Sequence, residues 1–489
     1  MEHREANWLI EANERWDRRE YTLALEAFLQ GQRCADDSLG LVSNVAEILY
    51  TLRRGPEAMA ILEAVRRLDS RYRPAHENLL TMGLSLEGHS ACGVARRHFH
   101  WGRLYENSVP ARCPRTRSAR LRLGYLSANF GLNPEGFFTL PFLQSHDRSR
   151  VEVFCYSNRV SDSWTPRFRN AADHWRDVWG QSDERVADQI ASDSIDILVD
   201  LSGHFEGGRL PVLAQRAAPI QVSFPTYPAT TGLTAVQYRI TDRWTDEPGR
   251  TETLHTEKLI RLNRCYCCYA PPLDAPAVAP LPALQNGFVT FGVLNRPQKI
   301  TDQMLRVWGG ILRETPGSHI LFHHVYNGAR PVQPEFRDPI LRVLAETGVS
   351  PDRIEFVGLR SPIDAHLAVF NQVDISLDTF PYHGMTTTCE SLWMGVPVVA
   401  LAGSSHVSRV GLSLSTSVGL ERFVAETEDQ YVSIARENAG DLDALARLRA
   451  SLREGMRRSP LTDVAGYSRC LEDAYEAMWE SEVEQKLTA

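Results

Sequence analysis

The sequence predicts an α/β protein with two doubly wound parallel-sheet domains and an all-α region in front of them. Alanines and large apolar residues recur at helical spacing from residue 1 to about 107. Strand-like apolar runs then alternate with helical stretches twice, over 121–240 and 288–401. We expect the two α/β domains to face one another with a cleft between. The expected domains are 1–107, 108–282 and 283–489.

Short apolar runs place the expected strands. In the first α/β region they are Arg122–Leu126, Val151–Tyr156, Ile195–Leu201, Ile220–Phe224 and Tyr238–Ile240. In the second they are Phe288–Gly292, Ser318–Phe322, Arg353–Val357, Val373–Leu377 and Val398–Leu401. A basic, proline-containing linker, Pro110–Arg120, marks the first boundary. The proline-rich segment Pro271–Pro282 neither alternates nor shows helical spacing, so it marks the second.

The N-terminal region carries a faint repeat. Ala24, Ala58 and Ala91 recur at about the 34-residue period of a tetratricopeptide repeat, and Pro74 falls where one repeat would follow another. Stacked helix pairs leave a groove that usually binds an extended peptide or another protein, so we expect a protein partner to bind there in part. A plain helical bundle packed on the catalytic part is the alternative.

Composition excludes several classes of protein. A net charge of −8 argues against general nucleic-acid binding, and no apolar run reaches the roughly 18 residues of a membrane span, which favours a cytoplasmic protein. The nine cysteines are irregularly spaced. The one cluster, Cys265, Cys267 and Cys268, would point to both faces of a strand, so we expect free thiols and no metal site.

The segment from Val373 to Gly395 is the most informative of the chain. An apolar strand runs into the turn containing Gly384, three threonines follow from Thr386 to Thr388, and a helical pattern closes at Gly395. A helix N-terminus with free N–H groups and hydroxyls suits a phosphate. Glu390, one helical turn further, is placed to accept hydrogen bonds from a ribose. A purely structural capping box from Thr387 to Glu390 is the alternative.

Other polar residues follow expected strands, at the sheet edge where ligands bind. Asn295 and Lys299 follow the strand that ends at Gly292, and the lysine could neutralise a departing diphosphate. His366 lies on a helical stretch where its ring could stack on a base. His204 lies among glycines that allow the backbone close to a sugar, which makes it a candidate base.

These segments together resemble a known family, the nucleocytoplasmic protein O-glycosyltransferases. It comprises O-GlcNAc transferase and its plant relative SPINDLY, a protein O-fucosyltransferase. The resemblance runs from about Leu121 to Trp479, with tetratricopeptide repeats before it as in the family. It is carried by LGYLSANF, IDILVDLSGH, APIQV, YPATTG, YRITD, NGFVTFG, DISLDTFPYHGMTTTCESLWMGVPVV, SRVGLSL and SPL, in that order.

The resemblance implies a GT-B fold and an inverting transfer to serine or threonine hydroxyls, without a metal or other cofactor. By position, it implies that Lys299 stabilises the diphosphate, His366 contacts the base and Glu390 binds the ribose. Thr386 and Thr387 match the family's phosphate-binding threonines. We add Asn295 and Gly384 to the expected donor site.

The sequence also departs from the family. Asn133 stands where members carry a histidine once favoured for catalysis, and Phe137 follows it. Thr226, Arg296 and Met385 replace residues usual near the cleft. We expect transfer of N-acetylglucosamine from UDP-N-acetylglucosamine to a protein. The alternatives are fucosyl transfer from GDP-fucose and a catalytically decayed tetratricopeptide adaptor.

Overall fold

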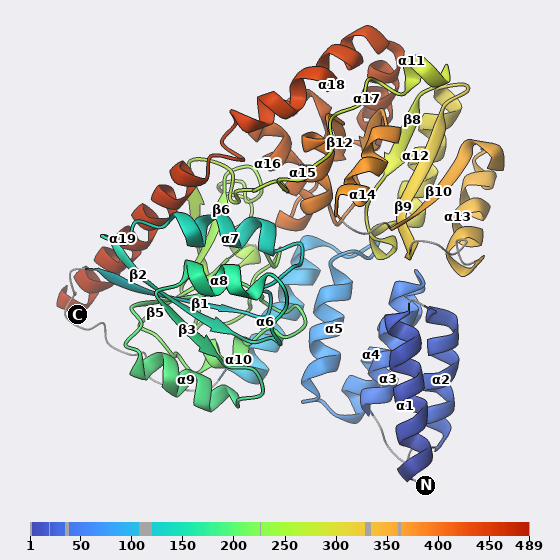
Figure 1. Ribbon diagram of the computed structural model, residues 1–489. Helices are drawn as coiled ribbons and strands as arrows, with labels where there is room; N and C mark the ends of the chain where they lie inside the picture. The colour runs from blue at the N-terminus through green and yellow to red at the C-terminus, as the bar shows by residue number, and fades with distance from the viewer. Residues whose placement is uncertain are drawn as a thin grey trace. The chain divides into compact units, whose positions relative to one another are not determined.

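The computed structural model describes residues 2–18, 20–34, 39–106, 120–224, 226–327, 334–359 and 363–488 (Figure 1). The chain folds as two compact units, each containing one parallel sheet. The first-sheet unit comprises Ser90–Pro271, Ser404–Gly419 and Glu454–Ala489. The second-sheet unit comprises Met1–His89, Pro272–Gly403 and Leu420–Arg453.

The first-sheet unit contains a seven-stranded sheet in the order β3-β2-β1-β4-β5-β6-β7, parallel throughout. Its order reverses beside β1, as in doubly wound folds. The strands are β1 Leu121–Ser127, β2 Val151–Ser157, β3 His174–Asp177, β4 Ile197–Asp200, β5 Ile220–Ser223, β6 Tyr238–Asp242 and β7 Lys258–Leu262.

Helices cover both faces of this sheet. Helices α7 (Gly136–Ser145) and α8 (Thr165–Ala171) lie on one side, with α9 (Asp183–Ser192) and α10 (Leu210–Ala214) on the other (Figure 1). The last helix, α19 (Val464–Thr488), also packs here, and its Tyr467, Leu471 and Trp479 join the core. A short helix, α16 (Val410–Ser417), belongs to the same unit. The expected domain 283–489 is therefore divided between the two units.

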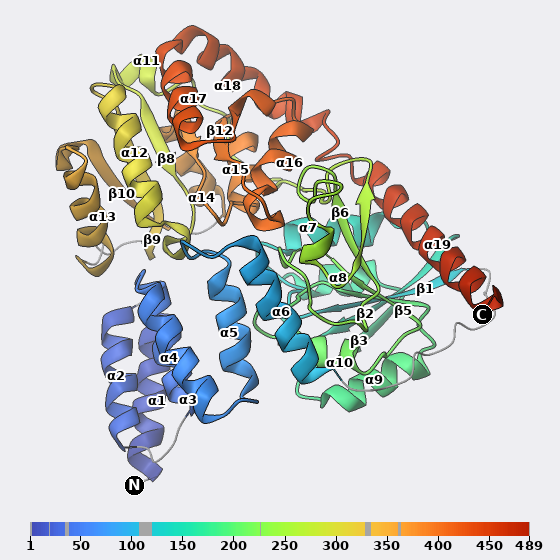
Figure 2. The same cartoon turned by 180° about the vertical axis from the view of Figure 1, so that it is seen from behind.

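The second-sheet unit contains a six-stranded parallel sheet in the order β10-β9-β8-β11-β12-β13. The strands are β8 Thr290–Val293, β9 His319–Asn327, β10 Ile354–Leu359, β11 Ile375–Leu377, β12 Val398–Leu401 and β13 Val424–Ala425. The helices are α11 Ala283–Asn286, α12 Asp302–Glu314, α13 Pro334–Glu346, α14 Ile363–Ala368, α15 Thr386–Trp393, α17 Glu428–Gly440 and α18 Leu442–Arg457. Helix α12 contacts both α13 and α17 (Figure 2).

Five helices from the start of the chain belong to the second-sheet unit. They are α1 Glu2–Asp17, α2 Tyr21–Cys34, α3 Leu39–Thr51, α4 Gly55–Leu68 and α5 Arg73–Gly83, and each contacts the next. Ala24 and Ala58 are fully buried at matching positions, the fourth residue of α2 and of α4. Ala91, the third alanine of the expected repeat, differs: it is the first residue of the next helix, is only half-buried, and belongs to the other unit.

The sixth helix, α6 (Ala91–Tyr105), packs instead in the first-sheet unit. Gly102 lies directly against the backbone of Gly232, and the His98 Nε2 accepts a hydrogen bond from the Tyr227 hydroxyl at 2.7 Å. The helical region expected over 1–107 is consequently not one unit. Among the described residues, no helix combines the length and apolarity that crossing a membrane requires.

We predict that Gly102→Ala destabilises the first-sheet unit. An added Cβ would lie 1.8 Å from the Gly232 carbonyl oxygen, so α6 or the loop must move. Overpacking of this kind costs about 3 kcal/mol, measurable as a lower melting temperature. Gly455→Ala, in α18 with nothing within 4 Å of its Cβ, is the matched control and should melt no lower than the wild type. Equal melting of the two variants would contradict the packing of α6.

Candidate functional site

The candidate site lies at the carboxyl ends of β8 and β11, in the second-sheet unit. These two strands are adjacent and parallel, so the residues that follow them emerge at the same edge of the sheet. Asn295 follows β8, and Asp378 follows β11. The Asn295 Nδ2 donates a hydrogen bond to the Asp378 Oδ1 at 3.0 Å, which joins the two strand ends.

Asp378 connects the segments that follow β8 and β11, although it was not among the residues predicted from the sequence. Its Oδ1 accepts three hydrogen bonds, from the Asn295 side chain at 3.0 Å, the Thr379 N–H at 2.9 Å and the Gly384 N–H at 2.8 Å. The side chain is fully buried. A carboxylate directly after an apolar strand and six residues before a glycine was the available signal. Asp378 therefore fixes the turn that leads into α15.

The glycine and threonine turn has the expected position. Helix α15 begins at Thr386, whose side chain is half-buried, and no side chain caps the helix N-terminus at Met385. The Thr387 hydroxyl donates to the Asn295 Oδ1 at 2.7 Å, so the capping box considered from the sequence is not formed. A Cβ on Gly384 would lie 2.5 Å from that hydroxyl. The turn thus presents backbone N–H groups at a helix terminus, as a phosphate requires.

Lys299 reaches the same turn. Its Nζ donates a hydrogen bond to the His383 carbonyl oxygen at 2.8 Å and lies 3.7 Å from the centre of the Tyr382 ring. Burial lowers the pKa of Lys299 to about 7; Asp378 opposes this shift, and Arg296 adds to it. An anionic ligand would restore the charged form. The Lys299 amine therefore lies beside the turn of α15, where an anionic ligand would favour its charged form.

His366 and Glu390 meet across 24 residues of sequence. The His366 Nε2 lies 3.2 Å from the Glu390 Oε2, and its Nδ1 lies 3.0 Å from the His323 Nε2. The His323 Nδ1 in turn lies 3.1 Å from the Val357 carbonyl oxygen, which only accepts. Because the carbonyl oxygen only accepts, the His323 Nδ1 must donate to Val357, and a neutral His323 then accepts at its Nε2 from the His366 Nδ1. The His366 Nε2 then faces the Glu390 carboxylate at the end of this series of contacts.

His204 lies elsewhere, in the first-sheet unit. It is buried against Trp101, His98 and Tyr227, and its Nε2 donates to the Thr231 carbonyl oxygen at 2.8 Å. Burial lowers its pKa well below the ordinary value, and the nearby His98 contributes in the same direction. A neutral imidazole of such low basicity is a poor proton acceptor. The geometry favours a packing role over the base role expected from the sequence.

The glycines around His204 allow close contacts within the protein, whereas the sequence predicted that they make room for a sugar. Gly203 has a φ of +56°, and a Cβ there would lie 2.4 Å from the Tyr227 Cβ. Gly208 lies against the Gly203 carbonyl oxygen, where a Cβ would approach to 2.1 Å. These glycines allow the backbone to fold upon itself and upon Tyr227.

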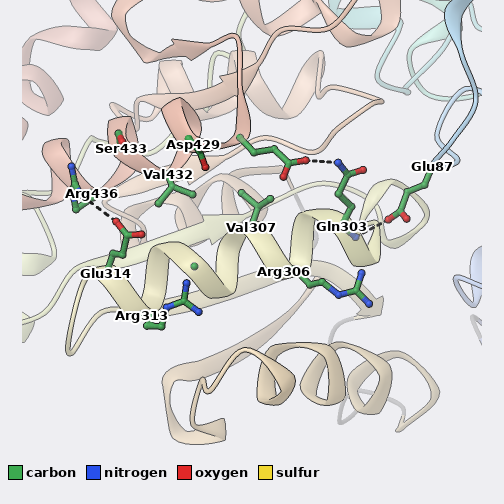
Figure 3. A pocket seen from close by; sticks show the side chains of 12 residues that line it. Glu87, Gln303, Arg306, Val307, Arg313, Glu314, Asp429, Val432, Ser433 and Arg436 are labelled. Atoms are coloured by element: carbon green, nitrogen blue, oxygen red, sulfur yellow. Dashed lines mark hydrogen bonds and ion pairs between the residues drawn. The ribbon is translucent and has the colours of Figure 1, made fainter.

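A separate hollow lies between α12 and α17 of the second-sheet unit (Figure 3). Much of its polar lining is paired internally. The Gln303 N–H donates to Glu87 at 2.7 Å, the Gln303 side chain donates to Glu428, and Arg436 pairs with Glu314 at 3.1 Å. The predicted site residues lie outside its lining, and its mixed charges select no single class of ligand.

The cysteine cluster is buried in the first-sheet unit. Cys265, Cys267 and Cys268 are buried free thiols, with the Cys265 and Cys267 sulfurs 3.6 Å apart. Within the described ranges, no three histidine, cysteine or acidic side chains gather as a metal would need.

Comparison with known proteins gives consistent matches. The model of the family described as Glycosyl transferase family 41 matches residues 105–269 and 281–471. The probable UDP-N-acetylglucosamine–peptide N-acetylglucosaminyltransferase SPINDLY of Hordeum vulgare is 41% identical over 424 residues, covering 84% of this chain and 44% of that protein. The similarly named SEC of Arabidopsis thaliana is 29% identical over 470 residues, covering 92% of this chain and 46% of that protein.

A solved structure matches over nearly the whole chain. A mutant O-GlcNAc transferase of Thermobaculum terrenum superposes with a TM-score of 0.88 at 33% identity, covering 95% of this chain and 89% of that one. This match confirms the expected α/β architecture of the GT-B type with helices before it. The chain spans about half the length of the curated relatives it matches.

We predict that Lys299→Met stabilises the ligand-free protein below about pH 7, relative to the wild type. The folded state lowers the pKa of Lys299 to about 7 from 10.5, so at lower pH it carries a buried charge at a cost. The wild type loses this penalty as the pH rises from 7 towards 10.5, because the folded state releases its proton first. Thermal melts at about pH 6, 8 and 10 should therefore show the difference shrinking with pH.

Lys258→Met, which removes an exposed lysine of β7, is the control. It should show no comparable change of the difference with pH. A constant difference between Lys299→Met and the wild type across this range would contradict the burial of the Lys299 charge.

Proposed function

This chain belongs to glycosyl transferase family 41, and on that premise we propose that it transfers N-acetylglucosamine from UDP-N-acetylglucosamine to serine or threonine hydroxyls of a protein. One observation carries the proposal. Asp378 and Asn295 hydrogen-bond to the turn and first residues of α15, and the Lys299 amine donates to the His383 carbonyl oxygen of the same turn. Such a site suits the diphosphate of a nucleotide sugar.

In the proposed reaction the acceptor hydroxyl attacks the anomeric carbon directly, which inverts its configuration. The bond from that carbon to the diphosphate breaks, and its electron pair leaves with UDP. Lys299 and the N–H groups at Thr386 and Thr387 take up the negative charge that grows on the leaving group. Groups fixed in a partly buried site stabilise such charge without reorganising. Leaving-group stabilisation thus supplies most of the proposed catalysis.

The nucleoside would occupy the neighbouring side chains. We propose that His366 stacks on the base and that Glu390 accepts hydrogen bonds from the ribose hydroxyls. Both side chains are nearly buried and lie 3.2 Å apart, and the His366 ring is held by its contact with His323. Nucleoside binding would replace the Glu390 contact to His366 with contacts to the ribose. We also propose that helices α1 to α5 contribute to binding of the acceptor protein, as stacked helix pairs do.

Two alternatives remain from the sequence. Fucosyl transfer from GDP-fucose is compatible with the same site, because a diphosphate is common to both donors. A decayed adaptor is opposed by the assembled contacts of Lys299, Asn295 and Glu390.

Calorimetric titration with UDP and with GDP discriminates among these functions. We expect UDP to bind with a dissociation constant of about micromolar order and GDP to bind much more weakly. Binding of GDP alone would favour fucosyl transfer, and binding of neither nucleotide would favour the adaptor.

We further predict that Lys299→Met lowers sugar transfer by about 100-fold or more, because one fixed group facing the developing charge is lost. Transfer would be measured with labelled UDP-N-acetylglucosamine and a pool of serine- and threonine-containing peptides. Lys258→Met should transfer like the wild type. If Lys299→Met kept most of the activity, leaving-group stabilisation by this residue would be wrong.

A further inference from the structure

Lys299 lies in a short segment whose backbone must be fixed if its side chain is to act on a ligand. A 3₁₀ helix, Pro297–Lys299, follows β8, and α12 begins at Asp302. A lysine side chain is long and flexible, so the place of its amine depends on the position of this backbone. A displacement of about 1 Å can lower the rate of an enzyme by about 100-fold. The contacts of this segment therefore bear on the chemistry proposed for Lys299.

One buried side chain from the start of the chain holds the residues that follow Lys299. Arg53 lies in the turn between α3 and α4. Its Nε donates to the Ile300 carbonyl oxygen at 3.0 Å, and its Nη2 donates to the Asp302 Oδ1 at 2.8 Å. The Arg53 side chain is only 6% exposed. Its planar guanidinium thus joins the backbone next to Lys299 to the first residue of α12.

The residue before Lys299 is held from the same place. The Gln298 Nε2 donates to the Thr51 Oγ1 at 3.2 Å, and Thr51 is the last residue of α3. All of these residues belong to the second-sheet unit. The residues on both sides of Lys299 therefore contact the end of α3 and the turn that follows it.

The backbone of Arg53 indicates that the turn itself does not require an arginine. Arg53 has a φ of +63°, in the left-handed region where a side chain costs free energy and glycine does not. The Arg54 N–H donates to the Leu49 carbonyl oxygen at 2.8 Å. This bond closes many helices, usually with glycine at the position that Arg53 occupies here. The turn alone would thus favour glycine.

The side chain of Arg53 also carries a cost. Burial lowers the pKa of Arg53, and the neighbouring Asp302 opposes this shift. Within the described ranges, neither hydrogen bond of the guanidinium goes to α3 or α4, since both go to the segment beyond Lys299. A residue that keeps an unfavourable backbone conformation and a buried charge is a candidate for a function. Its contacts place that function at Lys299.

We propose that Arg53 is a positioning residue for Lys299. This inference rests on the proposed function. By holding the Ile300 carbonyl oxygen and Asp302, the guanidinium keeps the backbone of Lys299 in place. The amine then stays beside the His383 carbonyl oxygen at the turn of α15. Arg53 itself touches no substrate. The helices at the start of the chain thus contribute to the transfer step as well as to binding of a protein.

Arg53→Gly tests the proposal, because it removes the guanidinium and suits the backbone of the turn better. If Arg53 served only the turn, this variant would fold and transfer sugar at least as well as the wild type. We expect instead that transfer to peptides falls by about 10-fold to 100-fold, because a displaced Lys299 stabilises the leaving group less. Arg216→Gly, at a φ of +52° in the first-sheet unit, is the matched control and should transfer like the wild type.

Combining Arg53→Gly with Lys299→Met gives a readout that a merely structural role would not move. If Arg53 acts through Lys299, the double variant transfers sugar at the rate of Lys299→Met alone, since the group that Arg53 positions is already absent. If Arg53 acts elsewhere in the protein, the two losses multiply. Multiplied losses would therefore overturn the proposal.

Thermal melts supply a measurement that needs no sugar transfer. The folded state lowers the pKa of Lys299 to about 7, so at lower pH its buried charge costs stability that Lys299→Met restores. When Arg53→Gly releases the segment, water reaches the amine and this pKa moves back towards its ordinary value. The stability that Lys299→Met restores at about pH 6 should therefore be smaller in the Arg53→Gly background. An unchanged difference would contradict the positioning role.

Arg53→Lys decides the question if Arg53→Gly fails to fold. It keeps the charge and the backbone conformation but lacks the planar fork that reaches both Ile300 and Asp302. We expect transfer about threefold to 10-fold below that of the wild type. Transfer equal to that of the wild type would overturn the proposal.

The outcomes separate the two levels of inference. If the wild type transfers sugar and Arg53→Gly stays within about threefold of it, the positioning role is overturned and the proposed function stands. If the wild type binds UDP but transfers no sugar to any peptide of the pool, the proposed function itself fails. The melts then still decide whether Arg53 positions Lys299.

Discussion

The buried carboxylate of Asp378 is the constraint on which the candidate site depends. One of its oxygens accepts three hydrogen bonds. The donors are the side chain of Asn295, which follows β8, the N–H of Thr379 and the N–H of Gly384 in the turn that enters α15. These donors offset part of the cost of burying a carboxylate. Each donor therefore fixes one wall of the site, and Asn295 extends the network to the Thr387 hydroxyl.

The helices at the start of the chain add a second support to the same site. Arg53, in the turn between α3 and α4, donates to the Ile300 carbonyl oxygen at 3.0 Å and pairs with Asp302 at 2.8 Å. Thr51 accepts a hydrogen bond from the Gln298 side chain at 3.2 Å. These contacts flank Lys299 on both sides within one compact unit. The helical region is thus part of the framework that holds the lysine, in addition to any surface that it offers to a protein.

The two units differ in the polar groups that they bury. The second-sheet unit gathers a cation, a helix terminus and a paired histidine and glutamate, which are groups that recognise a nucleotide diphosphate. The first-sheet unit buries Asp200 at the end of β4, where one oxygen accepts the Gly203 N–H at 2.7 Å. His98 and His204 of this unit are buried among aromatic rings, and burial lowers the pKa of His98 to about 4 and that of His204 well below its ordinary value.

The sequence by itself determined the alternation of strands and helices, because inner strands of parallel sheets are apolar throughout and easily recognised. It missed three edge strands, β3, β7 and β13, which are short or partly polar because one of their sides is unpaired. The strand ends also drew attention to Asn295, Lys299 and Glu390. Only the tertiary structure decided that Asp378 joins Asn295 to the turn of α15, that α6 and α19 pack in the first-sheet unit, and that His204 is buried among aromatic rings. Burial and hydrogen-bond partners are set by residues distant in sequence, and no local pattern records them.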